Sequence, residues 1–313
     1  MKLGIVMDPL ARINPQKDSS FAMLLEAQAR AYKIYYIEPA DIWQHNSEVL
    51  ANATIVKVAD NADNWFTLTV RETINLANLN VVLIRKNPPF DSNYLYLTQM
   101  LELVEKTGNL VVNQPAALRN FNEKLTISLF PELAPPTCVS AKQEVLREFL
   151  EIEGKIVVKP LDAMGGRSIF VVEKTDTNAN VILETITDGN NTLAMAQKYI
   201  NKISEGDKRV LLVNGKAVPF VLARIPGPKD FRGNLARGAI AKGQGFGEQE
   251  DRICKALSKF LRDNGLVFVG IDIIGEYLTE INITSPTGIR ELDKIFALNI
   301  AGVLFDAIES KLP

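Results

Sequence analysis

Histidine and cysteine are almost absent from this sequence. Its 313 residues contain one histidine, His45, and two cysteines, Cys138 and Cys254, which lie far apart. Zinc sites built on several histidines are therefore excluded, and a Ser-His-Asp triad could use only His45, which we expect in a solvated loop. The distant cysteines give no reason to expect a disulfide framework. Any chemistry must rest on carboxylates, lysines and arginines.

The sequence also lacks a strong charge imbalance and a long apolar run. The net charge of −2 gives no support for nucleic acid or a membrane surface as partners. No apolar stretch approaches the ~18 residues of a transmembrane helix, and the apolar start ends at Asp8, too early for a signal peptide. We therefore expect a cytoplasmic protein. Its length predicts two or three domains, and a hydrophobic content of 47% allows a sizeable core.

The first third of the chain alternates apolar runs with helical patterns. The patterns predict strands at 2–7, 33–37, 81–84 and 110–112, helices at 18–32 and 93–106, and a β-hairpin insertion at 47–72. This β-α-β rhythm indicates a parallel sheet with helices on its faces, and hence an α/β fold.

The remainder, beyond a proline-rich joint at 131–136, predicts α+β units. We expect strands at 155–161, 169–174 and 193–200, hairpins of 208–213 with 216–223 and of 266–274 with 278–284, and helices at 140–153, 247–264 and within 288–312. Asn214-Gly215 is a strong type I′ turn signal. Between the hairpins lies a Gly/Pro-rich loop, of the length often found in active-site lids.

Two lysines and a pair of glycines suggest an anion site. Lys159 lies in an otherwise apolar strand, where a lysine is costly unless it is paired or faces an anion; the alternative is an edge lysine that reaches water. The loop with Gly165-Gly166 could direct backbone N–H groups at a phosphate, although most such loops are only turns. Lys124 begins a helix, which suits an anion site, but alone it would be an ordinary solvated lysine.

The most informative cluster is acidic. Glu280 and Asn282 share one face of a strand, and Asp272 lies in the preceding apolar strand. Such oxygen ligands suit Mg²⁺, and the alternative is a polar sheet face. Asp272 should face Glu280 only if the hairpin loop has an odd length; a two-residue turn at 275–276 should separate them. Arg209, Arg224 and Arg232 could bind carboxylates or a tetrahedral anion, although singly each is typical of a protein surface.

Motifs along nearly the whole chain resemble those of one family. They are KLGIVMDP and DSSFAMLLEAQ near the start, RKNPPFD at 85–91, NEKL at 122–125, VVKPLDAMGG at 157–166, DKRVLLV at 207–213, ARIP at 223–226, RGNLA at 232–236 and GIDIIGEYLTEINITSPTGIRE at 270–291. On these motifs the chain resembles the ATP-grasp superfamily and, within it, the prokaryotic glutathione synthetases. It departs from that family's usual sequence at Ala163, at 227–231 and at Arg237.

The resemblance implies roles for the candidate residues. Lys124 and Lys159 would contact ATP phosphates under the Gly165-Gly166 loop. Adenine would be contacted by Gln197, Lys198, Tyr199 and Ile200, and ribose by Asp207. Mg²⁺ or Mn²⁺ would be held by Asp272, Glu280 and Asn282. The catalytic residues would be Arg209 and Arg232, and the substrate would be contacted by Arg224, Ser285 and Thr287.

The resemblance also implies the reaction, in which ATP joins γ-glutamylcysteine to glycine through an acyl phosphate, and a homotetramer. It implies an N-terminal domain at 1–122, a central ATP-grasp part at 123–200 and a C-terminal part at 201–313, with a flexible loop at 225–240. The alternatives are another ATP-grasp carboxylate–amine ligase or a catalytically silent ATP-binding protein.

Overall fold

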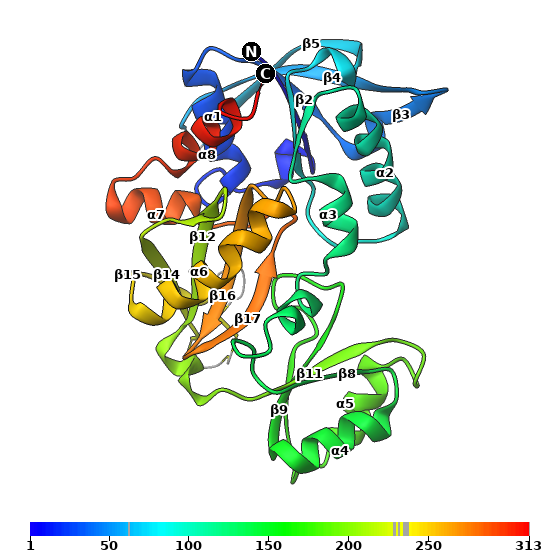
Figure 1. Ribbon diagram of the computed structural model, residues 1–313, viewed down its shortest axis with the longest axis vertical. Helices are drawn as coiled ribbons and strands as arrows, with labels where there is room; N and C mark the ends of the chain where they lie inside the picture. Colours follow the sequence, from blue (N-terminus) through cyan, green and yellow to red (C-terminus); the bar gives the residue numbers. More distant parts are fainter. Residues whose placement is uncertain (62, 228–229, 231, 234–237, 313) are drawn as a thin grey trace.

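The computed structural model describes residues 1–61, 63–227, 230, 232–233 and 238–312, and it contains three sheets (Figure 1). The first sheet has the strand order β3-β4-β2-β1-β6-β7, with β5 paired to β4. Its strands are β1 (Lys2–Met7), β2 (Lys33–Ile37), β3 (Ile42–His45), β4 (Glu48–Val58), β5 (Phe66–Asn75), β6 (Val81–Arg85) and β7 (Leu110–Val112). Its helices are α1 (Ser19–Ala29), α2 (Ser92–Lys106) and α3 (Pro115–Asn120), with short 3-10 turns at Leu10–Arg12, Pro39–Asp41 and Leu76–Asn78.

The predicted α/β character of this part is confirmed. β1, β2, β6 and β7 pair in parallel, and the antiparallel β4–β5 hairpin is the predicted insertion. Asp18 caps α1 by accepting the Phe21 N–H, as the sequence suggested. One expectation was wrong: His45 is exposed, but it ends edge strand β3 and does not lie in a loop.

The second sheet is small, antiparallel and ordered β10-β9-β11-β8. It comprises β8 (Thr137–Ser140), β9 (Lys155–Pro160), β10 (Phe170–Glu173) and β11 (Ala194–Lys198), covered by α4 (Gln143–Glu153) and α5 (Ala179–Ile186). Two amphipathic helices on one sheet face enclose a separate core around Leu146, Ile156 and Leu183. Strand β8 was not predicted, because its proline-rich approach has the pattern of a linker.

The third sheet is antiparallel and ordered β15-β14-β12-β16-β17, with β13 paired to β12. Its elements are β12 (Asp207–Val213), β13 (Lys216–Ala217), β14 (Phe220–Ile225), β15 (Ile240–Gly245), β16 (Phe268–Ile274), β17 (Tyr277–Asn282), α6 (Glu248–Asp263), α7 (Ile289–Phe296) and α8 (Ile300–Glu309). The 3-10 turn Asn201–Glu205 (η5) connects the second sheet to this one, and the 3-10 turn Leu125–Leu129 (η4) lies between α3 and the second sheet.

Two predictions for the third sheet need correction. The strand expected at 216–223 is interrupted at Val218-Pro219, where proline supplies no N–H to the ladder. Strand β15, which begins where the loop expected at 225–240 ends, was not predicted. Residues 228, 229, 231 and 234–237, which hold much of that loop and the departure at Arg237, lie outside the described residues. The turn at Asn214-Gly215 has the positive φ angles, 49° and 74°, that a type I′ turn requires.

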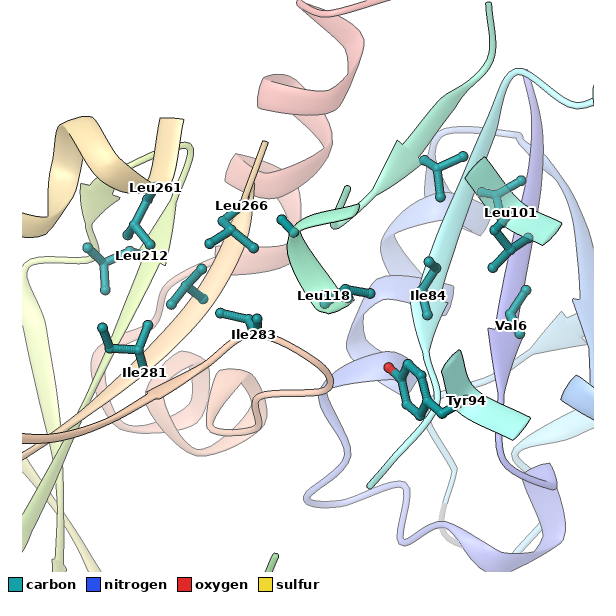
Figure 2. Packing of buried hydrophobic residues seen from close by; sticks show 14 of the residues in the cluster. Val6, Ile84, Tyr94, Leu101, Leu118, Leu212, Leu261, Leu266, Ile281 and Ile283 are labelled. Atoms are coloured by element: carbon teal, nitrogen blue, oxygen red, sulfur yellow. The ribbon is translucent and has the colours of Figure 1, made fainter. Parts of the chain in front are cut away.

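One hydrophobic cluster joins the first and third sheets. Figure 2 shows Leu118 of α3 lying between Ile84 and Tyr94 on one side and Leu266 and Ile283 on the other. These side chains are all at most 2% exposed. Truncating Leu118 to alanine would therefore cost on the order of 2–5 kcal/mol. The second sheet has its own core and lies at one end of the molecule (Figure 1). A cleft is lined by residues of this sheet and of the third sheet. The division at 1–122, 123–200 and 201–313 stays a prediction.

Candidate active site

A cleft of about 350 Å³ is lined by residues of the second and third sheets and of the segments that join them. Every candidate residue singled out from the sequence lines it: Lys124, Lys159, Gly165, Gly166, Gln197, Lys198, Tyr199, Ile200, Asp207, Arg209, Arg224, Arg232, Asp272, Glu280, Asn282, Ser285 and Thr287. Residues separated by more than 160 positions thus share one concave site, as expected of a ligand-binding site.

A β-bulge brings the two acidic residues opposite each other. Strands β16 and β17 are joined by the two-residue turn Gly275-Glu276, the even length that should have separated Asp272 from Glu280. The register shifts beside Asp272, so that Thr279 is an extra residue in β17 and Asp272 pairs directly with Glu280. The prediction that a two-residue turn would break the pair was therefore wrong, because a bulge restores the common face.

Asp272 is the centre of a buried ion-pair network. The Arg209 guanidinium donates to both its carboxylate oxygens, with Nη2 2.9 Å from Oδ2, and Arg224 Nη2 lies 2.9 Å from Oδ1. Asn282 Nδ2 donates to Oδ2 at 3.2 Å. Burial acts to raise the pKa of Asp272, but the two guanidinium groups outweigh it and hold this pKa well below its usual range. Asp272 is thus ionised and already charge-compensated.

Asp207 extends the network along β12. It pairs across the sheet with Arg224, whose Nη2 lies 2.5 Å from Asp207 Oδ2. Its other oxygen, Oδ1, is buried and has no hydrogen-bond partner among the residues that the structure describes. Burial raises the pKa of Asp207 to about 7. A buried carboxylate with one unused oxygen beside the cleft can accept a hydrogen bond from a ligand hydroxyl.

Glu280 lies between the two candidate lysines. Its Oε1 is 3.7 Å from Lys124 Nζ and 3.6 Å from Lys159 Nζ, and Lys124 Nζ also donates to the Ala163 carbonyl at 2.7 Å. Both lysines are buried, 5% and 6% exposed, so the solvated and edge-lysine alternatives are wrong. Burial lowers the pKa of Lys159, and the neighbouring Lys124 adds to this effect against the pull of Glu280.

The glycine-rich loop follows β9 and accepts a hydrogen bond from Lys124 through the Ala163 carbonyl. Gly165 and Gly166 have φ angles of 65° and 72°, and Ser168 has 56°, whereas Ala163 needs no positive φ. The departure from glycine at Ala163 is thus compatible with the path of this loop. Arg232 Nη1 donates to the Gly166 carbonyl at 2.8 Å and its guanidinium also pairs with Asp230. The lid segment therefore touches the loop directly.

The segment 197–200 ends the second sheet beside the cleft. The N–H groups of Lys198 and Tyr199 donate to the carbonyls of Pro136 and Lys155. Those two amide donors are already used, so the predicted backbone contacts with adenine must come from other groups of this segment. Lys155 Nζ also lies over the Tyr199 ring, 4.3 Å from its centroid.

Two residues from the first sheet contribute to the site and were missed by the sequence reasoning. Ser285 Oγ donates to Asn87 Oδ1 at 2.6 Å, and buried Arg85 Nη2 donates to the Pro286 carbonyl at 2.8 Å. Burial lowers the pKa of Arg85 to about 10. Thr287 accepts a hydrogen bond through its carbonyl from Arg209 Nη1. The signal was available in the motif RKNPPFD, whose charged end follows a buried strand.

The net charge of the cleft suits an anion. Seven cationic residues line the cleft against four carboxylates, which leaves three positive charges if all are ionised; the cations are Lys124, Lys159, Arg167, Lys198, Arg209, Arg224 and Arg232, and the carboxylates are Glu123, Asp207, Asp272 and Glu280. A polyphosphate would complete such a site.

The site also holds oxygen donors for a divalent metal. In the part of the chain that the structure describes, no group of three or more His, Cys, Asp or Glu could hold a metal. Mg²⁺, however, binds through one or two carboxylates together with phosphates and water. Glu280, 22% exposed toward the cleft, and the amide oxygen of Asn282 fit this role. Asp272 would join them only if an arginine gave up one of its oxygens.

The fold defines the class of protein. The chain superposes on D-cycloserine synthetase DcsG with a TM-score of 0.70 at 15% identity, covering 100% of both chains. It superposes on the ATP-grasp ligase PsnB with a TM-score of 0.66 at 17% identity, covering 99% of this chain and 98% of PsnB. The fold is therefore the ATP-grasp fold. Among the described residues, no helix is long and apolar enough to cross a membrane.

Sequence similarity narrows the class to a family. Residues 1–119 match the N-terminal domain of prokaryotic glutathione synthetase, and residues 123–297 match its ATP-grasp domain. The chain is 48% identical to glutathione synthetase of Coxiella burnetii over 311 residues, covering 99% of this chain and 97% of the relative. It is 48% identical to that of Escherichia coli O127:H6 over 312 residues, covering 100% and 99%. The chain belongs to the prokaryotic glutathione synthetase family.

Proposed function

We propose that this chain makes glutathione by joining γ-glutamylcysteine to glycine, with conversion of ATP to ADP and phosphate. The observation that carries the proposal is the cleft itself, where the lysines, arginines and carboxylates singled out from the sequence meet in a member of this family. The site contains no histidine, since His45 lies in β3, and a ligation through an acyl phosphate needs neither a histidine base nor a protein nucleophile.

ATP would bind between the second and third sheets. Lys124 and Lys159 would contact the phosphates, with the Gly165-Gly166 loop above them. The adenine would lie against the segment 197–200. Asp207 would accept a hydrogen bond from a ribose hydroxyl through Oδ1, which has no partner in the described part of the chain. The support is the positive balance of the cleft and the burial of both lysines, since a buried cation favours an anionic partner.

Glu280 and Asn282 would hold Mg²⁺ or Mn²⁺, with Asp272 as a third candidate ligand. Such an ion would neutralise negative charge that develops during phosphoryl transfer. The donor set supports this role because it is made of oxygen atoms and faces the two phosphate lysines.

In the first step, the cysteinyl carboxylate of the peptide attacks the γ-phosphorus of ATP, and ADP leaves. The glycine amine then attacks the acyl carbon and forms the C–N bond. The C–O bond to phosphate breaks, phosphate leaves with its electron pair, and the proton lost by the amine passes to the departing phosphate or to water. Arg209 and Arg232 would stabilise the developing negative charge, and Arg224, Ser285 and Thr287 would position the peptide or glycine. Arg232 touches the glycine loop, so lid closure there would also exclude water from the acyl phosphate.

The direct test measures ADP release with γ-glutamylcysteine plus glycine and with other acceptor amines. We expect turnover with glycine and little with larger amino acids. Turnover only with a different peptide or amine would replace this proposal by the second candidate, another ATP-grasp carboxylate–amine ligase. ATP binding with no turnover on any pair would favour a silent ATP-binding protein.

We further propose a homotetramer that acts in the cytoplasm. The family resemblance supports the homotetramer. The two separate free cysteines support the cytoplasmic location, because reduced thiols are typical of that compartment. Sedimentation equilibrium tests the assembly: a single species of one-chain mass at micromolar concentration would contradict it.

A further inference from the structure

Glu123 makes an unusual set of contacts beside the nucleotide cleft. Its Oε1 accepts three hydrogen bonds, from the Ile283 N–H at 2.8 Å, the Thr284 N–H at 2.9 Å and the Thr284 Oγ1 hydroxyl at 2.8 Å. Its backbone carbonyl accepts a fourth, from the Ile281 N–H at 2.9 Å. A single residue therefore fixes the end of β17, the strand that carries Glu280 and Asn282.

The residues on either side of Glu123 bond in another direction. Asn122 Nδ2 donates to the Leu161 carbonyl at 3.1 Å, and Lys124 Nζ donates to the Ala163 carbonyl at 2.7 Å. Both acceptors belong to the loop that follows β9 of the second sheet. The Asn122 side chain also accepts from the Lys124 N–H at 3.0 Å, which fixes the backbone of the segment. The three consecutive residues Asn122, Glu123 and Lys124 thus join the glycine-rich loop to the third sheet.

This arrangement determines where the Lys124 ammonium lies. It lies 3.7 Å from Glu280 Oε1, and Glu123 makes the hydrogen bonds that hold the backbone beside it against the end of β17. A carboxylate suits this position because an ionised oxygen accepts several hydrogen bonds more strongly than a neutral one. Glu123 has no ion-pair partner among the described residues, so its charge is balanced only by these donors and the cations nearby.

We propose that Glu123 is a positioning residue of the nucleotide site, which sets Lys124 against Glu280 by clamping the segment 122–124 to the end of β17. The proposal rests on the proposed function in that Lys124 contacts ATP. It assigns Glu123 no contact with the reacting atoms. The competing explanation is a purely structural anchor, whose loss would lower stability and leave nucleotide affinity unchanged in the folded protein.

The experiment measures the Kd for ATP by calorimetry, with Mg²⁺ present and the peptide absent, in wild type, Glu123→Ala and Glu123→Gln. Melting temperatures are recorded in parallel, and binding is measured well below them. We expect Glu123→Ala to raise the Kd by on the order of tenfold, as for other residues that orient a ligand-binding group. Glu123→Gln keeps an acceptor oxygen and should recover most of the affinity. Glu132→Ala, at an exposed glutamate on the following segment, is the matched control.

A mutant cycle with Lys124→Ala separates positioning from anchoring. If Glu123 acts through Lys124, removing Lys124 should raise the Kd far less in the Glu123→Ala background than in wild type. If Glu123→Ala does not fold, the cycle uses Thr284→Val, which removes one of the three donors and preserves side-chain shape. Additive effects, or an unchanged Kd in folded Glu123→Ala, would overturn this proposal. Absence of ATP binding in wild type would instead overturn the proposed function.

Discussion

The Arg209 guanidinium binds the Asp272 carboxylate with two of its nitrogens, both residues being buried in strands that pair across the third sheet. The carboxylate chosen from the sequence as a metal ligand is thus also the counter-ion of the residue chosen as a catalytic arginine. Arg224 shares the same carboxylate. Asp272 therefore orients the cationic side of the cleft, whatever it contributes to metal binding.

Replacing Asp272 by asparagine should destabilise the protein strongly. Two buried guanidinium groups would lose their shared counter-ion, and breaking a buried pair in this way costs on the order of 3–5 kcal/mol. Urea unfolding measures the change, with Asp263→Asn on the exposed end of α6 as control. A loss equal to that of the control would show that Asp272 does not hold the network together.

Replacing Glu280 by glutamine should impair metal use. We expect turnover to fall on the order of 10–100-fold and the Mg²⁺ concentration needed for half-maximal rate to rise, because one charged oxygen donor is lost. Glu276→Gln changes an equivalent residue at the tip of the same hairpin and should leave both quantities unchanged. Unchanged turnover of Glu280→Gln across a Mg²⁺ titration would contradict the proposed metal role.

Nucleotide binding should be coupled to proton uptake at Lys159. Burial lowers the pKa of this lysine in the free protein, so part of it loses its proton as the pH rises. Bound phosphates favour the charged form and raise the pKa again, so binding takes up protons from alkaline solution.

Calorimetry of ATP binding in buffers of different ionisation enthalpy measures this uptake. It should grow from neutral toward alkaline pH in wild type and be smaller in Lys159→Arg, since arginine stays protonated. Lys198→Arg makes the same lysine-to-arginine substitution at a half-exposed lysine of the same cleft and serves as the control. Equal uptake in wild type and Lys159→Arg would show that Lys159 does not meet the phosphates.

Replacing Arg232 by alanine should uncouple ATP hydrolysis from ligation. The contact between Arg232 and the Gly166 carbonyl joins the lid to the glycine loop, and its loss should admit water to the acyl phosphate. The ratio of phosphate released to glutathione formed should rise above the wild-type value of about one expected for coupled transfer. Lys255→Ala, on the exposed face of α6, is the control. If this ratio is unchanged in Arg232→Ala, the contact between Arg232 and Gly166 does not keep water from the acyl phosphate.

Much of the fold could be predicted because its elements have regular patterns. The strands 33–37 and 110–112 were predicted with their observed ends, and α2 was predicted within a residue of its start, because each is bounded by a turn or capping residue. β8 and β15 were missed. β8 follows a proline-rich joint, and β15, with sequence Ile-Ala-Lys-Gly-Gln-Gly, is an edge strand with little apolar character.

The site could be predicted as a set of residues but not as a network. A buried lysine in an apolar strand is a local signal, and so is an acid–amide pair at strand spacing. The bulge at Thr279 leaves no such signal, because it depends on how two strands fit together, and it reversed the outcome expected from the even turn. The motif RKNPPFD could have drawn attention to Arg85 and Asn87, but their partners, Pro286 and Ser285, depend on how the first sheet packs against the third.

The central claim is ligation through an acyl phosphate, and oxygen transfer tests it most directly. γ-Glutamylcysteine labelled with ¹⁸O in its cysteinyl carboxylate is incubated with glycine, ATP and Mg²⁺, and the released phosphate is analysed by mass spectrometry. We expect one ¹⁸O atom in each phosphate, because the attacking carboxylate oxygen leaves with the phosphoryl group, together with ADP and glutathione in equal amounts. Unlabelled phosphate, or glutathione formation with release of AMP, would contradict it.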